Sequence, residues 1–194
     1  MPFSRVAGFI ASVAVVETQT VRAGDVELVV REWGEPTGRP LVFWHGLNPF
    51  GALALNEAGP AWAAAGFRVV APAAPGCGDS ASLPTAEQYL PSRLAALVLD
   101  LASALDVARF AFVGWSWGAT VGVHLAATGA PLDALVLVDA GHTDVVVEAV
   151  RRFAELLPRA DMRTLRGGHD LLADAPAETI AIVAEFVGST PRRV

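Results

Sequence analysis

Three short stretches of this sequence contain side chains that could carry out nucleophilic chemistry. Ser116 lies between Gly114 and Gly118 in the segment FVGWSWGAT, a G-x-S-x-G pattern. A serine in that pattern becomes a nucleophile when a strained strand-to-helix turn exposes its hydroxyl. The pattern alone is common, so the surrounding sequence has to decide between a nucleophile and a serine in a glycine-rich turn.

The residues on both sides of Ser116 favour the nucleophile. The segment ARFAFVGWS, residues 108–116, predicts a strand, and residues 118–127 predict a helix of small residues. Glycines beside the serine leave room for the chain to fold back at such a turn. The helix N-terminus favours negative charge there, and the N–H of Trp117 would point at a developing oxyanion.

Two further stretches supply the partners that such a serine needs. WHGLN, residues 44–48, ends an apolar strand with His-Gly, and the N–H of Leu47 is a candidate second oxyanion donor. RGGHDLLAD places His169 in a glycine-rich loop after the last predicted strand. One serine, one oxyanion turn and one loop histidine, in that chain order, are far more specific than any of them alone.

On these motifs the chain resembles the serine-hydrolase branch of the α/β-hydrolase fold superfamily, over residues 20–188. HGLN resembles the family's oxyanion turn, GWSWGA its nucleophile elbow and GGHD its histidine loop. APAAPGCGDS resembles the D-x-P-G-x-G-x-S loop, with Ala73 where the family usually has Asp.

The resemblance implies a role for each matching residue. Ser116 is expected to be the nucleophile and His169 the general base. The backbone N–H groups of Leu47 and Trp117 are expected to form the oxyanion hole, and His45 to be a structural histidine of the turn. No cofactor and no metal are implied.

The chain departs from the family after its sixth predicted strand, residues 133–140. The family usually continues with a helical cap, a seventh strand that ends in the triad acid, and an eighth strand before the histidine. Here residues 141–160 hold only one predicted helix, 145–157, and its loops. We expect a minimal hydrolase without a cap, with the last strand moved beside the sixth. A natural or engineered deletion that folds but reacts poorly is the alternative.

The same departure from the family leaves two candidates for the acid of the triad. Asp139 ends the strand next to the one that leads to Ser116, and some branches of the family place their acid there. Asp144, in the following loop, is the second candidate. Asp170 adjoins His169, but its side chain should point away from the ring.

Strands and helices alternate from residue 41 to the end of the chain. This order predicts a three-layer α/β/α sandwich with a mostly parallel sheet, and residues 25–34 predict one strand of an N-terminal antiparallel hairpin. Residues 1–18 are expected to be an N-terminal extension and residues 19–194 a single domain. The remaining predicted helices are 56–65, 93–105 and 175–187.

Composition narrows the classes of function. Hydrophobic residues make up 53 % of the 194, which indicates one packed domain. The net charge is −6 and the 14 cationic residues, all Arg, are scattered, so no nucleic-acid partner is expected. Cys77 is the only cysteine, which excludes an intrachain disulfide, and no histidine cluster has metal-ligand spacing.

The N-terminus leaves the location of the protein open. Residues 4–17 form a weak secretory pattern, and no apolar run is long enough to span a membrane. We expect a cytoplasmic protein, with secretion as the alternative, and the oligomeric state stays open.

These residues favour a serine hydrolase that cleaves a small carboxylic ester through an acyl-enzyme. One alternative is a catalytically weak or inactive scaffold or binding protein. Another is a cofactor-free perhydrolase or haloperoxidase with the same triad. The three tryptophans Trp44, Trp115 and Trp117 could line an apolar acyl groove or belong to the core.

Overall fold

The computed structural model describes residues 17–48, 51, 55–138, 155, 163, 165 and 168–191. Its strands are β1 Glu17–Ala23, β2 Val26–Trp33, β3 Arg39–Trp44, β4 Phe67–Pro72, β5 Phe110–Trp115 and β6 Leu132–Val138. Its helices are α1 Ala58–Ala64, α2 Pro91–Ala104, α3 Trp117–Ala127, α5 Leu171–Asp174 and α6 Pro176–Ser189, with a 3-10 turn η2 Ala86–Tyr89.

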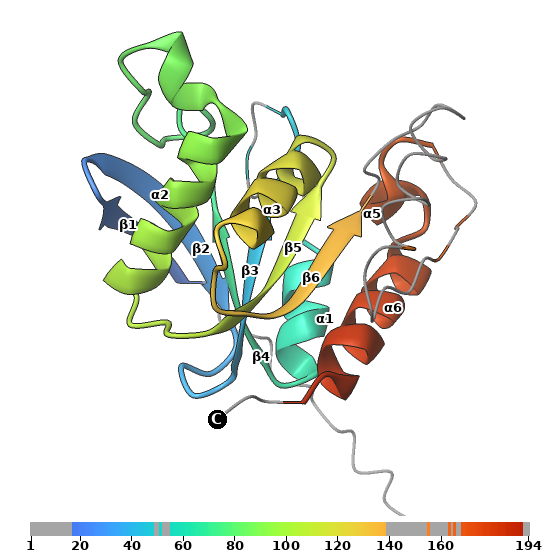
Figure 1. Cartoon of the computed structure of the whole chain (residues 1–194). Coiled ribbons are helices and arrows are strands. Elements are labelled where there is room, and N and C mark those ends of the chain that lie inside the picture. The colour runs from blue at the N-terminus through green and yellow to red at the C-terminus, as the bar shows by residue number, and fades with distance from the viewer. Residues whose placement is uncertain are drawn as a thin grey trace, which may run out of the picture.

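These strands form one sheet in the order β1-β2-β4-β3-β5-β6 (Figure 1). β1 and β2 form an antiparallel hairpin, and β2 pairs antiparallel with β4. The pairs β4–β3, β3–β5 and β5–β6 are parallel. The predicted parallel sheet with an N-terminal antiparallel hairpin is therefore confirmed.

Helices cover both faces of the sheet (Figure 1). α2 and α3 pack on one face over a core that includes Leu28, Val42 and Phe112. α1 and α6 pack on the other face over a core that includes Leu41, Phe43 and Val113. β3 and β5 are buried on both faces, which explains their continuous apolar sequences. The three-layer sandwich is confirmed.

The helix and strand boundaries follow the sequence closely where they can be compared. α2 begins at Pro91, two residues before the predicted start, because proline is favoured in the first turn of a helix. Residues 139–140 of the sixth predicted strand lie outside the described residues. So do residues 1–16, nearly all of the helix expected at 145–157 and most of the strand expected before the histidine.

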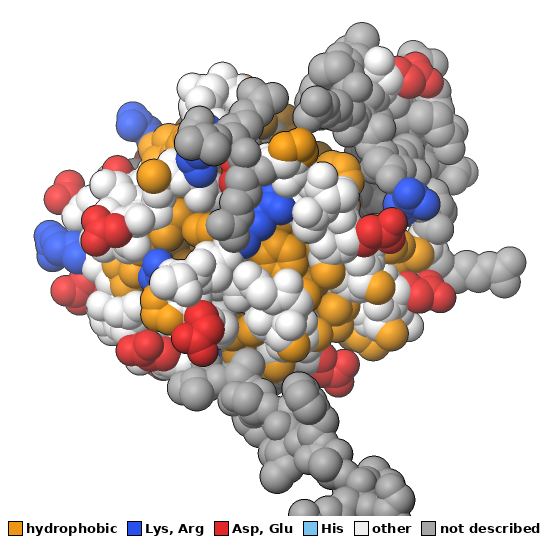
Figure 2. All heavy atoms as spheres, turned by 90° about the horizontal axis from the view of Figure 1, so that it is seen from below, with side chains coloured by type: hydrophobic (Ala, Val, Ile, Leu, Met, Phe, Trp, Pro, Cys, Tyr) orange, Lys and Arg blue, Asp and Glu red, His pale blue; other side chains and the backbone are white. Residues whose placement is uncertain are grey.

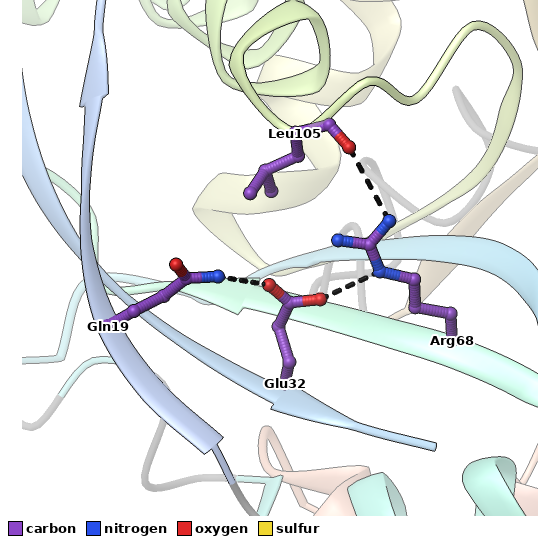
Figure 3. Close-up of polar contacts among 4 residues, drawn as sticks. All are labelled: Gln19, Glu32, Arg68 and Leu105. Atoms are coloured by element: carbon purple, nitrogen blue, oxygen red, sulfur yellow. Dashed lines mark hydrogen bonds and ion pairs between the residues drawn. The ribbon is translucent and has the colours of Figure 1, made fainter. Parts of the chain in front are cut away.

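A polar network joins the hairpin to the rest of the sheet (Figure 3). Arg68 Nε lies 2.8 Å from Glu32 Oε2, and Gln19 Nε2 donates to Glu32 Oε1 at 2.6 Å. Arg68 also donates to the carbonyl of Leu105 just after α2, at 3.4 Å. The network therefore links β1, β2, β4 and the end of α2.

Charge is dispersed on the side of the molecule seen from below. Figure 2 shows acidic and basic side chains spread singly among apolar and neutral ones on this face, without a broad basic patch. No helix in the described part of the chain has the length and apolar character that crossing a bilayer requires.

Candidate active site

Ser116 occupies a sharp turn between β5 and α3. Its φ is 53° and its ψ is −112°, a backbone conformation that is costly for a residue with a side chain. Two backbone hydrogen bonds hold the turn: the Ser116 N–H donates to the Val138 carbonyl and the Ala119 N–H donates to the Ser116 carbonyl, both at 2.9 Å. The turn has the strain that the sequence predicted.

The two glycines of the motif allow the chain to pack closely around this turn. A Cβ on Gly114 would lie 2.8 Å from the Ala119 nitrogen. A Cβ on Gly118 would lie 2.9 Å from the carbonyl carbon of Trp44 and 3.0 Å from the carbonyl oxygen of His45. Backbone atoms fill both positions, so a side chain at either one forces the turn or its neighbours to move.

The turn after β3 passes directly beside the serine. A Cβ on Gly46 would lie 3.1 Å from the Ser116 Cβ and 3.5 Å from its Oγ. Leu47 follows in the same turn, and its side chain is 82 % exposed. Trp117 is the first residue of α3, so its N–H has no acceptor within the helix. The two predicted oxyanion donors therefore belong to the two backbone segments that flank Ser116.

His45 holds the oxyanion turn against the next loop. Its ring is 1 % exposed, and its Nε2 accepts a 2.8 Å hydrogen bond from the Ala74 N–H. The proton must therefore be on Nδ1, which donates to the Gly46 carbonyl at 2.6 Å. Burial lowers the pKa of His45, against a smaller opposing effect of the Gly46 hydrogen bond. A neutral histidine with both ring nitrogens occupied is a structural residue here.

The loop after β4 is closed by Ser80. Its hydroxyl donates to the Ala73 carbonyl at 2.8 Å and accepts from the Val29 N–H at 2.9 Å. Ala73, which departs from the family pattern, is 6 % exposed. A Cβ on Gly51 would lie 2.8 Å from the Ala73 methyl group, so small residues meet at this point.

His169 precedes the short helix α5 and reaches Ser116 from the C-terminal part of the chain. Its Nε2 lies 2.9 Å from the Ser116 Oγ, within hydrogen-bond distance. Its carbonyl accepts a 3.2 Å hydrogen bond from Trp115 Nε1. The neighbouring Asp170 accepts a hydrogen bond from the Ala173 N–H at 3.2 Å, so its carboxylate caps α5.

Arg39 anchors the end of α6, the second helix after His169, and the sequence did not reveal this role. The side chain is buried at the start of β3 and donates to the Val187 carbonyl near the end of α6. It also donates to the carbonyls of Gly188 at 3.5 Å and Thr190 at 2.9 Å. The only possible signal in the sequence was a cation at the head of an apolar run, and that does not identify a partner about 150 residues away.

The remaining predicted residues fall into two groups. Asp139, Asp144 and His142 lie outside the described residues. His124 is exposed on α3, and Trp44 is buried in the core, which rules it out as part of an acyl groove. Within the described residues, no group of three or more His, Cys, Asp or Glu side chains could hold a metal ion.

Residues 39–178 match the alpha/beta hydrolase fold family, and this match covers more than half of the chain. The chain belongs to this family. It is 35 % identical over 143 residues to the protein "Putative non-heme haloperoxidase" of Mycobacterium phage D29, covering 71 % of this chain and 50 % of the relative. The chain thus spans about half the length of this curated relative.

Solved structures share the fold with this hydrolase-family chain. The Thermoplasma acidophilum protein described as a predicted CIB-like hydrolase has a TM-score of 0.80 at 18 % identity, over 90 % of this chain and 98 % of its own. At that identity the likeness shows the fold alone. Epoxide hydrolase A from Mycobacterium thermoresistibile has a TM-score of 0.60 at 28 % identity, over 72 % of this chain and 45 % of its own.

A third solved structure has a name that refers to a different activity. The proline iminopeptidase-related protein from Thermus thermophilus has a TM-score of 0.58 at 30 % identity, over 64 % of this chain and 45 % of its own. The names differ in reaction, so what these solved structures share with this chain is the fold.

Proposed function

We propose that this chain is a serine hydrolase that cleaves carboxylic esters through an acyl-enzyme on Ser116. The observation that carries the proposal is the 2.9 Å distance between Ser116 Oγ and His169 Nε2. A general base must be within hydrogen-bond reach of the proton that it removes, and this pair meets that requirement. The strained backbone at Ser116 supports the same role, because strain of this kind gathers at functional residues.

The proposed reaction uses these groups in turn. Ser116 Oγ attacks the ester carbonyl carbon while His169 Nε2 takes the hydroxyl proton. The N–H groups of Leu47 and Trp117 stabilise the negative oxygen of the tetrahedral intermediate. The intermediate collapses, the alcohol leaves with the proton from His169, and an acyl group stays on Ser116. Water then attacks the acyl carbon, His169 takes its proton and returns it to Ser116, and the acid is released.

Asp139 is our proposal for the acid that orients His169. The residue before it, Val138, pairs with Trp115 in the sheet and accepts the hydrogen bond from the Ser116 N–H. Asp139 therefore directly follows a residue whose backbone contacts Ser116. A carboxylate on the imidazole Nδ1 side fixes the tautomer and stabilises the imidazolium.

A second candidate uses the same acyl-enzyme with hydrogen peroxide as the acceptor. Peroxide then replaces water, the acyl group leaves as a peracid, and the peracid oxidises a halide to a hypohalous acid while it becomes a carboxylate. The relative from phage D29 is named as a haloperoxidase, and this name favours the peroxide reaction over simple hydrolysis. The Ser116–His169 pair serves both reactions equally.

Acyl-enzyme formation and acceptor choice can be measured in one assay. Rapid mixing with p-nitrophenyl acetate should release p-nitrophenol in a burst of about one equivalent per chain, or at a steady rate if acylation is the slower step. Ser116→Ala should abolish both. Peracid should form when peroxide is added if the second candidate is right, and acetate alone if the first is right. An inactive scaffold would give neither product above the rate in buffer.

A further inference from the structure

We propose that Trp115 and Asp174 are positioning residues that hold the backbone on both sides of His169 and so keep its ring against Ser116. This inference rests on the proposed function, because it concerns the geometry of that same pair. In the described part of the chain, neither side chain forms a hydrogen bond with the Ser116 hydroxyl. Both act through the histidine.

Trp115 fixes the carbonyl of His169. Its side chain is 7 % exposed and belongs to the core cluster under α1 and α6. The indole Nε1–H donates to the His169 carbonyl at 3.2 Å, and the indole and imidazole ring centroids lie 6.3 Å apart with the planes tilted by 37°. A buried indole has little freedom to move, so this hydrogen bond ties an exposed histidine to the rigid core.

Trp115 is also the residue before the nucleophile. Its backbone ends β5 and its side chain reaches the loop that carries the base. One residue thus sets the position of Ser116 through the main chain and that of His169 through the side chain. Any motion of β5 would move both members of the pair together.

Asp174 fixes the chain on the other side of His169. Its Oδ2 accepts a 2.6 Å hydrogen bond from the Gly168 N–H. This bond spans six residues and closes the segment from Gly168 to the end of α5 into a ring. Inside the ring, the backbone N–H groups of Ala173 and Asp174 both donate to the Asp170 carbonyl, at 3.0 and 2.7 Å.

The ring is attached to the core through α6. The Thr179 hydroxyl, on a residue 3 % exposed, donates to the Leu171 carbonyl at 3.0 Å. Trp62 Nε1 donates to the Ile180 carbonyl at 3.1 Å on the same helix. The Thr179 bond joins α5 to α6, and the Trp62 bond joins α6 to α1. Trp115 and Asp174 instead hold the backbone at His169 and Gly168.

Two matched tryptophan variants separate positioning from general anchoring. Trp115→Phe removes the indole N–H that binds the His169 carbonyl, and Trp62→Phe removes an indole N–H that binds the same C-terminal unit at α6 instead. We expect Trp115→Phe to lower kcat and the rate of fluorophosphonate labelling by about tenfold, with KM within about twofold. Trp62→Phe should lower Tm but leave the labelling rate within about twofold of the wild type.

Asp174 has its own controls. Asp174→Ala should slow labelling by about fivefold, and Asp174→Asn, which keeps an acceptor oxygen, should restore most of the rate. Glu178→Ala removes another exposed carboxylate nearby, in the first turn of α6, and should change little. Rescue by Asn together with a silent Glu178→Ala identifies the hydrogen bond rather than the charge as the cause.

The outcomes separate this inference from the proposed function. If the wild type is labelled and Trp115→Phe reacts as fast as Trp62→Phe, Trp115 is not a positioning residue. If the wild type is not labelled at all, the proposed function fails, and hydrogen exchange at Gly168 and His169 then decides. Faster exchange there in Trp115→Phe and Asp174→Ala, but not in Trp62→Phe, supports the positioning role, and equal exchange overturns it.

Discussion

Gly118→Ala is the substitution that tests the close packing of the nucleophile turn most sharply. The new Cβ would lie 2.9 Å from the Trp44 carbonyl carbon and closer still to its oxygen. Ordinary Cβ contacts begin at 3.4 Å, so relieving the contact with the carbon alone requires a separation of about 0.5 Å, and relieving the closer contact with the oxygen requires more. The atoms that must move are backbone atoms of the strand that leads into the oxyanion turn, and they cannot relax by a change of rotamer.

The expected cost has a kinetic and a structural part. Overpacking of this kind destabilises a fold by about 1–3 kcal/mol. Displacing the Leu47 N–H from the reacting oxygen by about half an ångström or more should slow acylation about 10- to 100-fold, since a misplacement of about 1 Å costs about a hundredfold. The free energy of unfolding in urea and the second-order rate of fluorophosphonate labelling measure the two effects separately.

Gly122→Ala is the matched control on the same helix. Its Cβ would meet Phe112 Cε1 at 2.9 Å and Leu135 Cδ1 at 3.1 Å, which are ends of side chains. It should therefore destabilise the fold by a similar or smaller amount and leave labelling within about twofold. Wild-type labelling of Gly118→Ala, or an equal loss of labelling in Gly122→Ala, would show that the close approach of Gly118 to Trp44 does not position the oxyanion turn.

Three further substitutions test other parts of the structure. Burial lowers the pKa of His45, so the contribution of the neutral ring to the free energy of unfolding is complete above about pH 6.5. This contribution is lost as the pH falls toward the lower pKa of the folded state, by up to about 1.4 kcal/mol per pH unit. Unfolding in urea at about pH 7.5 and about pH 5.5 should show this loss, and His45→Gln should lack it. Arg39→Met leaves carbonyls at the end of α6 without their donor, so the free energy of unfolding should fall by about 2–4 kcal/mol. The exposed control Arg22→Met should change it by no more than about 0.5 kcal/mol, and equal effects of the two variants would show that Arg39 does not anchor α6. Asp139→Asn should keep the circular dichroism spectrum and lower turnover at least about tenfold, and full activity in both Asp139→Asn and Asp144→Asn would leave a Ser–His dyad.

Local patterns explain how much of this fold could be predicted. Strands such as FAFVGW are buried on both faces and read as unbroken apolar runs, and Pro and Gly mark the turns between elements. The nucleophile turn was predictable from a local pattern as well. Gly114 is required by contacts with backbone atoms a few residues away, and Gly118 by contacts with the backbone at the end of the neighbouring strand β3.

The supporting contacts of the histidine were not predictable, because they join distant residues. The Trp115–His169 bond spans 54 residues and the Arg39 contacts with the end of α6 span 148 or more. Nothing in the sequence near Trp115 distinguishes an indole that donates to a distant carbonyl from one that only packs. Asp174 illustrates the same limit at short range, since an aspartate shortly before a proline predicts a helix boundary and not a bond back to Gly168.

Intact-mass analysis after fluorophosphonate treatment shows whether Ser116 is a nucleophile activated by His169. We expect a single adduct per chain, located on the peptide that contains Ser116. The adduct should be absent in Ser116→Ala and should form much more slowly in His169→Gln. An adduct that persists in Ser116→Ala, or a wild type that does not react while the fold is intact, would show that Ser116 is not the nucleophile.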